Sequence, residues 1–544
     1  MPKPQLLSDP FLQLPTETSV RVVWFTEFVG THHLVEYGHK LEKTVIASTT
    51  ELSRLREDQD STTTNIYQQL TKRPVYRHEA EVKGLNSPAR LPYRVISSDL
   101  DGNSISSKIF TLAPKPKPGT SLKILLTSDH QLKPMTTANL EKVVETVGLP
   151  DAIFFAGDLV NNPDRASEWF DDRQGNSFFP SLQGRAEYEL LSENTNTIYR
   201  GAELIQHTPI YTAIGNHEVM GRFSPENSLE DQFDDAYPRA AAAQISGKSL
   251  DEVPLEWLKN NSFNTDSYEE IFSLPESDSG GKKYYAVSFG DLRLVVLFIT
   301  LIWREPNPDS DEKGRYYETE KYFSKQINWG YGQHIFEPIV KGSEQYSWLE
   351  KEINSPEFQQ AKYKVVMFHH PPHTLGHEAI PPYTDPIPKI ERNSDHTIKA
   401  IRYEYPPEAD YLIRDLVPLL ESVGTQLVFY GHSHLWNRFL SPAGTNYLEA
   451  SNVGNSYGAY LGENKRFVPE GADYAATGNP NGLAPIVPNL TPLLSAEGQP
   501  LPYIASNEIT VFAILDTEKG MVSSYYFDTN FPNSEVVKFD EFKL

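Results

Sequence analysis

The chain of 544 residues contains no cysteine. This absence excludes disulfides, thiolate nucleophiles and cysteine-ligated zinc, so a metal site would need oxygen and nitrogen ligands. Long apolar runs are also missing, since no stretch approaches the roughly 20 apolar residues of a membrane span. The start, Met1-Pro2-Lys3-Pro4, has no apolar run of signal-peptide length. We expect a soluble protein, cytoplasmic on the sequence as it stands, with a removed export leader as the open alternative.

Positive charge is in short supply. The chain has 49 Lys and Arg against 73 Asp and Glu, which gives a formal net charge of −24. A surface of this sign repels nucleic acids and anionic membranes, so we expect neither as a partner. It also repels an anionic substrate at long range. Phosphate chemistry would therefore need a strong local positive charge, for which metal ions are the obvious source.

The composition is that of a folded protein, with 39% hydrophobic, 12% aromatic and 22% charged residues. The length exceeds one ordinary domain, so we expect a small domain followed by a large one. Residues 1–113 alternate apolar and polar positions in short runs, as at Val20, Val22 and Trp24, which predicts a β-sandwich. A charged stretch, Glu51–Asp58, is the only helical candidate there. His32 and His33 do not form a metal pair, because neighbouring strand positions face opposite ways, and we expect them on the surface.

The proline-rich segment 114–120 is typical of an extended linker. Strands and helices alternate across residues 121–544, which indicates an α/β domain. One helix carries Leu140, Val143 and Val147 at helical spacing and ends at Gly148. Long polar segments near 161–203, 222–282 and 467–504 look like insertions, and such segments are usually functional loops or lids. We find no internal repeats.

Five polar signatures each follow a short apolar strand. They are Ser128-Asp129-His130-Gln131, Gly157-Asp158-Leu159-Val160-Asn161, Gly215-Asn216-His217-Glu218, His369-His370-Pro371 and Gly431-His432-Ser433-His434. Ligands of open α/β sheets bind at the carboxyl ends of the strands, so these side chains should meet. Read singly, a Gly-Asp is more often a turn and a lone His a structural residue, whereas the ordered set of five predicts a binding site.

The ligand mix of carboxylates, an amide and imidazoles suits manganese, iron, zinc or magnesium. One carboxylate can bridge two ions, and such a pair can activate water and clamp an in-line phosphoryl displacement. An acidic protein could thus bind phosphate at this point.

The order of these signatures resembles that of the calcineurin-like metallophosphoesterases, with Val366-Met367-Phe368-His369 as the Val-x-x-His motif. The all-β region in front, and the strand pair within Tyr284–Thr300, resemble the purple acid phosphatase branch. The resemblance implies a fibronectin-III-like β-sandwich followed by a four-layer αββα metallophosphoesterase sandwich, an α+β and α/β multi-domain fold.

The same resemblance implies two metal ions with Asp158 as the bridge. The other ligands would be Asp129 and His434 for the first ion, and Asn216, His369 and His432 for the second. A bridging hydroxide would be the nucleophile. His217 would stabilise the phosphate or protonate the leaving group, with Glu218 orienting its imidazole.

The chain departs from the family pattern at two positions. Many members have a histidine where Gln131 stands, and purple acid phosphatases have a metal-bound tyrosine where Asn161 stands. We count Gln131 as a weak ligand, expect a colourless protein, and expect manganese or magnesium to be favoured at the first site. Three further residues are candidates for substrate contact: Asn216, Arg222 and the loop histidine His377, the last also as a catalytic group.

Three functions remain open on the sequence. The first is hydrolysis of small phosphate monoesters, and the second is a phosphodiesterase or nucleotide pyrophosphatase with the same cluster. The third is a metal-poor binding or scaffolding protein, which the complete ligand set disfavours. The sequence does not determine the oligomeric state.

Overall fold

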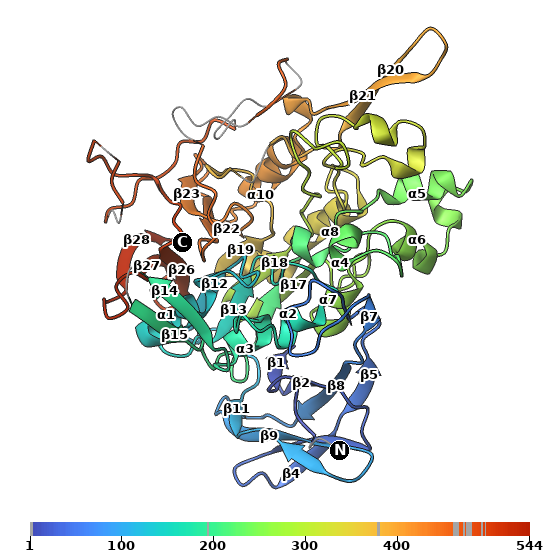
Figure 1. The fold of residues 1–544 in the computed structure, drawn as a ribbon. Helices are drawn as coiled ribbons and strands as arrows, with labels where there is room; N and C mark the ends of the chain where they lie inside the picture. The colour runs from blue at the N-terminus through green and yellow to red at the C-terminus, as the bar shows by residue number, and fades with distance from the viewer. Residues whose placement is uncertain are drawn as a thin grey trace.

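The computed structural model describes residues 4–192, 195–377, 381–460, 467–471, 474, 481–490, 493–495 and 497–544. The N-terminal strands form a β-rich body beside a larger α/β body that also holds the C-terminal strands (Figure 1). Among the helices of the described segments, none combines the length and the apolar character needed to cross a bilayer.

Two antiparallel sheets make up the N-terminal region, with strand orders β1-β2-β8-β5 and β10-β9-β3-β4, where β11 also pairs with β9. The strands are β1 (Phe11–Gln13), β2 (Ser19–Thr26), β3 (His32–Tyr37), β4 (Lys43–Ile46), β5 (Ser48–Glu51), β8 (Tyr76–Lys83), β9 (Leu91–Ser98), β10 (Ser104–Ser106) and β11 (Phe110–Leu112), with β6 (Arg56–Glu57) and β7 (Thr71–Lys72) as a separate pair. Val20, Val22 and Trp24 enter one core with side chains of the other sheet, as their alternation predicts.

Two expectations for this region are wrong. The stretch Glu51–Asp58 is not helical, because it contains the end of β5 and all of β6. His33 is buried, because its imidazole bonds to the Ser97 hydroxyl (2.9 Å) and the Val29 carbonyl (2.7 Å) and stacks on His78 at 3.6 Å. Internal hydrogen bonds make this burial possible for a polar ring.

The N-terminal region packs against the α/β region through apolar and charged contacts. Phe11 and Phe25 share the large core cluster of the α/β region. Arg56 pairs with Asp164 at 2.5 Å, and Arg73 pairs with Asp171 at 2.6 Å. These contacts hold the first predicted insertion against the N-terminal sheets.

Two sheets face each other in the α/β region. The first has the order β16 (Ile210–Thr212), β13 (Ala152–Phe155), β12 (Lys123–Thr127), β26 (Ile509–Asp516), β27 (Met521–Asp528) and β28 (Val537–Lys543). The second has the order β17 (Tyr285–Phe289), β18 (Leu292–Val296), β19 (Tyr363–Met367), β22 (Leu427–Tyr430), β24 (Asn446–Ala450), β23 (Trp436–Leu440) and β25 (Tyr503–Ile504). Residues from both sheets build one core between them.

Helices pack on both sheets: the helix Thr136–Val147 contacts β26 of the first sheet, and the helices within residues 344–360 and 417–422 share a core with strands of the second sheet. The helices are α1 (Thr136–Val147), α2 (Ala166–Phe170), α3 (Phe178–Leu182), α4 (Leu229–Phe233), α5 (Arg239–Ile245), α6 (Leu255–Asn261), α7 (Asp266–Ile271), α8 (Glu344–Ile353), α9 (Pro356–Gln360) and α10 (Val417–Ser422). Short turns of helix are η1 (Asn216–Glu218), η2 (Leu250–Glu252), η3 (Glu320–Tyr322), η4 (Gln326–Asn328), η5 (Pro407–Ala409) and the π-helical η6 (Leu412–Leu416). As predicted, the helix containing Leu140 ends at Val147, and the Gly148 N–H caps it.

The first two predicted insertions contain structure of their own. Segment 161–203 holds α2, α3 and the hairpin of β14 (Tyr188–Ser192) and β15 (Thr195–Tyr199), and segment 222–282 holds α4 to α7. Segment 467–504 lies partly outside the described residues. A further hairpin, β20 (Ile387–Arg392) with β21 (Ile398–Glu404), projects from the body (Figure 1).

Candidate metal centre

The five polar signatures meet because the strands before them run parallel and in register. In the first sheet, Thr127 pairs with Phe155, and Phe155 pairs with Thr212. In the second sheet, Met367 pairs with Phe429. The loops that follow these strands therefore leave the two sheets at one edge, which brings their ligand residues together.

His369 lies at the middle of the cluster. Its Nε2 is 3.1 Å from Asn216 Oδ1, 3.1 Å from Asp158 Oδ2 and 3.2 Å from His432 Nδ1. The ligand atoms of Asp129, Asp158 and His369 all lie within 4.8 Å of one another. At the other end of the cluster, His434 Nε2 is 3.5 Å from Asp129 Oδ1. The structure thus brings together the residues predicted for both ions.

Carbonyl oxygens fix the tautomers of two of these histidines. The Nδ1–H of His369 donates to the Ala156 carbonyl at 2.8 Å, and the Nδ1–H of His434 donates to the Asn455 carbonyl at 2.9 Å. Because a carbonyl oxygen can only accept, Nδ1 carries the hydrogen in both rings. The unprotonated Nε2 is then left for a metal ion, which is the usual support for an imidazole ligand.

The glycines of the motifs are required by close approach. A Cβ on Gly215 would lie 2.1 Å from Asp158 Oδ1, and a Cβ on Gly431 would lie 2.2 Å from Asp129 Oδ2. Any side chain at these positions would displace a carboxylate of the cluster. The Gly-Asn-His and Gly-His-x-His motifs therefore owe their glycines to the ligands of neighbouring strands.

Backbone strain is concentrated at the predicted ligands. Five of them have a left-handed φ: Asp129 (58°), Gln131 (38°), Asp158 (58°), His432 (82°) and His434 (52°). Residues other than glycine rarely adopt this backbone conformation. Such strain persists where the surrounding structure enforces it, often at functional sites.

Gln131 has the geometry expected of a weak oxygen ligand. Its amide nitrogen donates to Asp158 Oδ2 at 3.3 Å, which turns Oε1 the other way. That Oε1 is buried and has no donor within the described residues. A buried unsatisfied oxygen next to two carboxylates fits a cation that would complete its coordination.

The electrostatics of the cluster favour a bound cation. Burial raises the pKa of Asp129 to about 7, opposed by the neighbouring His369 imidazole. Burial also disfavours the His369 imidazolium, but Asp158 and Asp129 outweigh it and raise the pKa of His369 to about 9. The two carboxylates thus draw positive charge into the buried site, where a metal ion would replace the protons.

His217 lies beside the cluster. Its Nδ1–H donates to the Asn161 carbonyl at 2.6 Å, and its ring stacks on Phe233 at 5.1 Å. Nε2 is therefore the nitrogen that can gain or lose a proton on the side of the cavity. Burial lowers the pKa of this imidazole, opposed by the carboxylate of Asp158.

The expected role of Glu218 is wrong. Its carboxylate accepts hydrogen bonds from the backbone N–H groups of Gly215 (2.7 Å), Asp158 (2.8 Å) and Leu159 (2.7 Å). Glu218 therefore ties two strand ends together, and the Asn161 carbonyl orients His217 instead. His130 serves packing, since its ring bonds to the Thr127 hydroxyl and lies against Phe155.

The cluster opens into a cavity of about 600 Å³. Gln131, Asp158, Asn216, His217, His432 and His434 form its metal-side lining. Glu230, Phe233 and Asp234 of the second predicted insertion form another part of the wall. This insertion therefore contributes to the site directly, as a lining element.

The two candidate substrate residues outside the cluster have different positions. His377 lines the metal cavity, with its ring 4.3 Å from that of Tyr460. Arg222 lines a neighbouring cavity and is held by both oxygens of Asp235 at 2.7 and 2.9 Å. The structure thus brings His377 to the metal centre and places Arg222 beside it.

Sequence reasoning missed several residues of this site. Lys133, Trp303, Arg315 and Tyr457 line the cavity, and they come from loops whose sequences carry no recognisable motif. His370, which directly follows a ligand and was therefore noticeable in the sequence, stacks on His432 at 3.8 Å.

The comparisons with known proteins agree with this geometry. A sequence model of the calcineurin-like phosphoesterase family matches residues 122–435, more than half of the chain. No curated protein sequence gives a significant match. A purple acid phosphatase from yellow lupin (Lupinus luteus) seeds has a similar structure, with a TM-score of 0.53 at 14% identity over 98% of this chain and 74% of that chain.

Two further solved structures have lower scores. PhoD gives a TM-score of 0.45 at 14% identity, covering 97% of this chain and 88% of its own. A dimetal phosphatase from Danio rerio gives 0.30 at 11% identity, covering 77% and 98%. The family match implies a dinuclear metal site, which the grouped His and Asp residues fit. The chain belongs to the calcineurin-like phosphoesterase family and is a metal-dependent phosphoric ester hydrolase.

Proposed function

We propose that the protein hydrolyses phosphate monoesters of small molecules at this centre. The observation that carries the proposal is the convergence of the predicted ligand groups at the floor of one cavity. Two ions would be held by Asp129, Gln131, Asp158, Asn216, His369, His432 and His434. When bound, the ions would supply an activated water and neutralise the phosphoryl oxygens.

The protein's own groups would do the remaining work. The amide of Asn216 and the imidazole of His217 both line the cavity and would contact the phosphoryl group. With Nδ1 committed to the Asn161 carbonyl, the protonated Nε2 of His217 would donate its hydrogen to the leaving-group oxygen. The stacking on Phe233 holds the ring in that orientation. His377 would contact the substrate from the cavity wall.

The cation site and two cationic side chains support a monoester. A monoester dianion carries one more negative charge than a diester, and Lys133 and Arg315 would attract it beside the metal ions, although Glu230, Asp234 and Glu305 line the same cavity. A phosphodiesterase or nucleotide pyrophosphatase is the second candidate, because about 600 Å³ would hold a large group on each side of the phosphorus.

The test is a comparison of kcat/KM on p-nitrophenyl phosphate and bis(p-nitrophenyl) phosphate after reconstitution with manganese. We expect the monoester to be the better substrate. A preference for the diester would overturn the monoester assignment and favour the second candidate.

The metal identities follow from the ligands. Replacement of an imidazole or phenolate by the Gln131 amide should favour manganese or magnesium at the first site. Elemental analysis after competition among manganese, iron, zinc and magnesium would measure this preference. Iron or zinc at both sites would contradict it.

We also propose a division of the chain into an N-terminal domain (1–113), a linker (114–120) and a catalytic domain (121–544). The two facing N-terminal sheets support a fibronectin-III-like sandwich for the first domain. Arg222 would influence the substrate only indirectly, because its guanidinium is bonded to Asp235 and lines the neighbouring cavity.

A further inference from the structure

One cation in the cavity wall has no partner among the described residues. Arg315 lies in the long segment after β18 and is only 2% exposed. None of its three guanidinium nitrogens has a hydrogen-bond acceptor or an ion pair within the described residues. The same side chain lines the metal cavity. The buried arginines Arg56, Arg73 and Arg438, by contrast, all pair with carboxylates.

A buried, unpaired guanidinium is costly to the folded protein. Desolvation of a charge is repaid only by an opposite charge or by hydrogen bonds that satisfy its donors. Arg315 carries five N–H donors in a fixed plane, a geometry that matches the two oxygens of a phosphate or carboxylate. A site of this kind is therefore prepared for an oxyanion that arrives from outside the chain.

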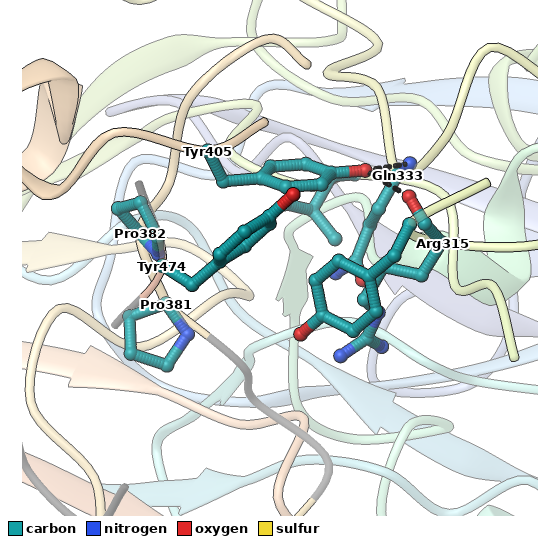
Figure 2. Close-up of a pocket in the computed structure, with 8 residues that line it drawn as sticks. Arg315, Gln333, Pro381, Pro382, Tyr405 and Tyr474 are labelled. Atoms are coloured by element: carbon teal, nitrogen blue, oxygen red, sulfur yellow. Dashed lines mark hydrogen bonds between the residues drawn. The ribbon is translucent and has the colours of Figure 1, made fainter. Parts of the chain in front are cut away.

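The backbone of Arg315 is fixed independently of its charge. Its N–H donates to the Glu305 carbonyl at 2.8 Å, and its carbonyl accepts from the Tyr405 hydroxyl at 2.6 Å. The same hydroxyl accepts from the Gln333 N–H at 2.7 Å, and the Arg315 guanidinium points away from it (Figure 2). The backbone that carries this cation is thus fixed before any ligand binds.

The anion that meets Arg315 must come from the metal cavity. Arg315 also lines a small cavity behind it, together with Pro381, Pro382 and Tyr405, but that space of about 10 Å³ holds no more than a single water. The carboxylate of Glu305 also lines the metal cavity, yet it forms no ion pair with Arg315 among the residues described. Only the larger cavity has room for a substrate group.

Arg315 comes from a different part of the chain than the groups that would hold the reacting phosphoryl. It belongs to the segment that follows β18, whereas His217, Asn216 and Lys133 come from the loops of the first sheet. The cavity wall also includes Trp303 and Phe336, whose aromatic side chains carry no charge. A cavity of about 600 Å³ leaves space between the metal ligands and this wall for the body of a substrate.

We propose that Arg315 binds a second anionic group of the substrate, a phosphate or a carboxylate, while the reacting phosphoryl group lies on the metal cluster. This inference rests on the proposed function and narrows its substrate class. The preferred substrates are then phosphoesters whose alcohol part carries its own negative charge.

Calorimetric titration of the manganese-loaded full chain with non-hydrolysable phosphonates tests this inference without turnover. The probes are ethylphosphonate, with one anionic group, and 3-phosphonopropionate and 1,3-propanediphosphonate, with two. We expect the wild type to bind at least one two-group probe roughly 10- to 100-fold more tightly than ethylphosphonate, as for a charge-assisted pair. The probe with the larger gain identifies carboxylate or phosphate as the second group.

Substitutions test whether the gain in affinity depends on Arg315 or on the rest of the cavity. Arg315→Gln should abolish the gain, and Arg315→Lys should retain part of it, because lysine keeps the charge but loses the planar fork. Arg392→Gln, on the exposed β20 hairpin, removes the same charge outside the lining of the metal cavity and should leave the gain unchanged. Metal content by elemental analysis should be preserved in all three variants. The thermal midpoint should be unchanged in Arg392→Gln and should not fall in Arg315→Gln, because loss of a buried unpaired charge removes its desolvation cost.

Two results would overturn the inference. One is a gain that is absent in the wild type or retained in Arg315→Gln. The other is an equal weakening of all three probes in Arg315→Gln, which would mean that the guanidinium holds the reacting phosphoryl itself. Failure of the proposed function is separate, because it would appear as absent hydrolysis of p-nitrophenyl phosphate in the wild type.

Discussion

Replacement of His217 by alanine tests the chemistry of the site most informatively. The imidazole lies beside the cluster, held by the bond of its Nδ1–H to the Asn161 carbonyl and by stacking on Phe233, and the proposed set of metal ligands does not include it. His217→Ala should therefore leave the metal content unchanged. The substitution should remove the group that donates a proton to the leaving-group oxygen.

The size of the effect follows from these contacts. Loss of a positioned proton donor typically costs about 10²–10⁴-fold in rate. The substitution also leaves the Asn161 carbonyl without its 2.6 Å partner, which costs about 1–3 kcal/mol of stability. A fall in kcat of about 10²–10⁴-fold with a modest fall in the thermal midpoint is thus expected.

The assay compares two leaving groups. p-Nitrophenolate leaves without a proton, whereas the phenolate of phenyl phosphate gains more from one, so the loss should be larger on phenyl phosphate. His396→Ala, in the exposed β20–β21 turn, is the matched control and should behave as the wild type. Full turnover in His217→Ala, or equal losses on both substrates, would refute the proton-donor role.

Three further predictions concern the metal cluster. Asp158→Ala should abolish metal uptake and activity together, and elemental analysis showing two ions per chain in this variant would contradict the bridging role. Gly431→Ala should lower metal affinity by at least about tenfold, because its Cβ would lie 2.2 Å from Asp129 Oδ2, and unchanged affinity in a metal titration would show that the carboxylate can move. Metal affinity should rise with pH by about tenfold per unit between pH 7 and 9 and level off above pH 9, because His369, with its pKa raised to about 9, must lose its proton to bind a cation. Below pH 7 the rise should be steeper, because Asp129, with its pKa raised to about 7, must then lose a proton as well; a flat profile between pH 6 and 8 would exclude this coupling.

Much of the site was predictable from sequence. Short apolar strands followed by Asp129, Asp158 and His369 give both the sheet and the location of the ligands, since parallel strands end at one edge. The strand limits follow less directly from the sequence. The strand pair expected within Tyr284–Thr300 is present as β17 and β18, but β18 extends only as far as Val296.

What escaped prediction depends on contacts between distant segments. Glu218 follows His217 directly, yet it binds backbone N–H groups of another loop, because the turn of η1 points its carboxylate toward Asp158. Arg315 lies in a polar loop where an arginine normally meets solvent, and only the packing of that loop reveals its burial. His33 became a core residue because a neighbouring strand supplied the Ser97 hydroxyl.

The most direct test of the central claim is anomalous diffraction from crystals of the manganese-reconstituted protein. The account predicts two peaks about 3.5–4 Å apart, bridged by Asp158, one near Asp129 and His434 and the other near Asn216, His369 and His432. A single peak, or peaks away from these side chains, would contradict a two-metal site.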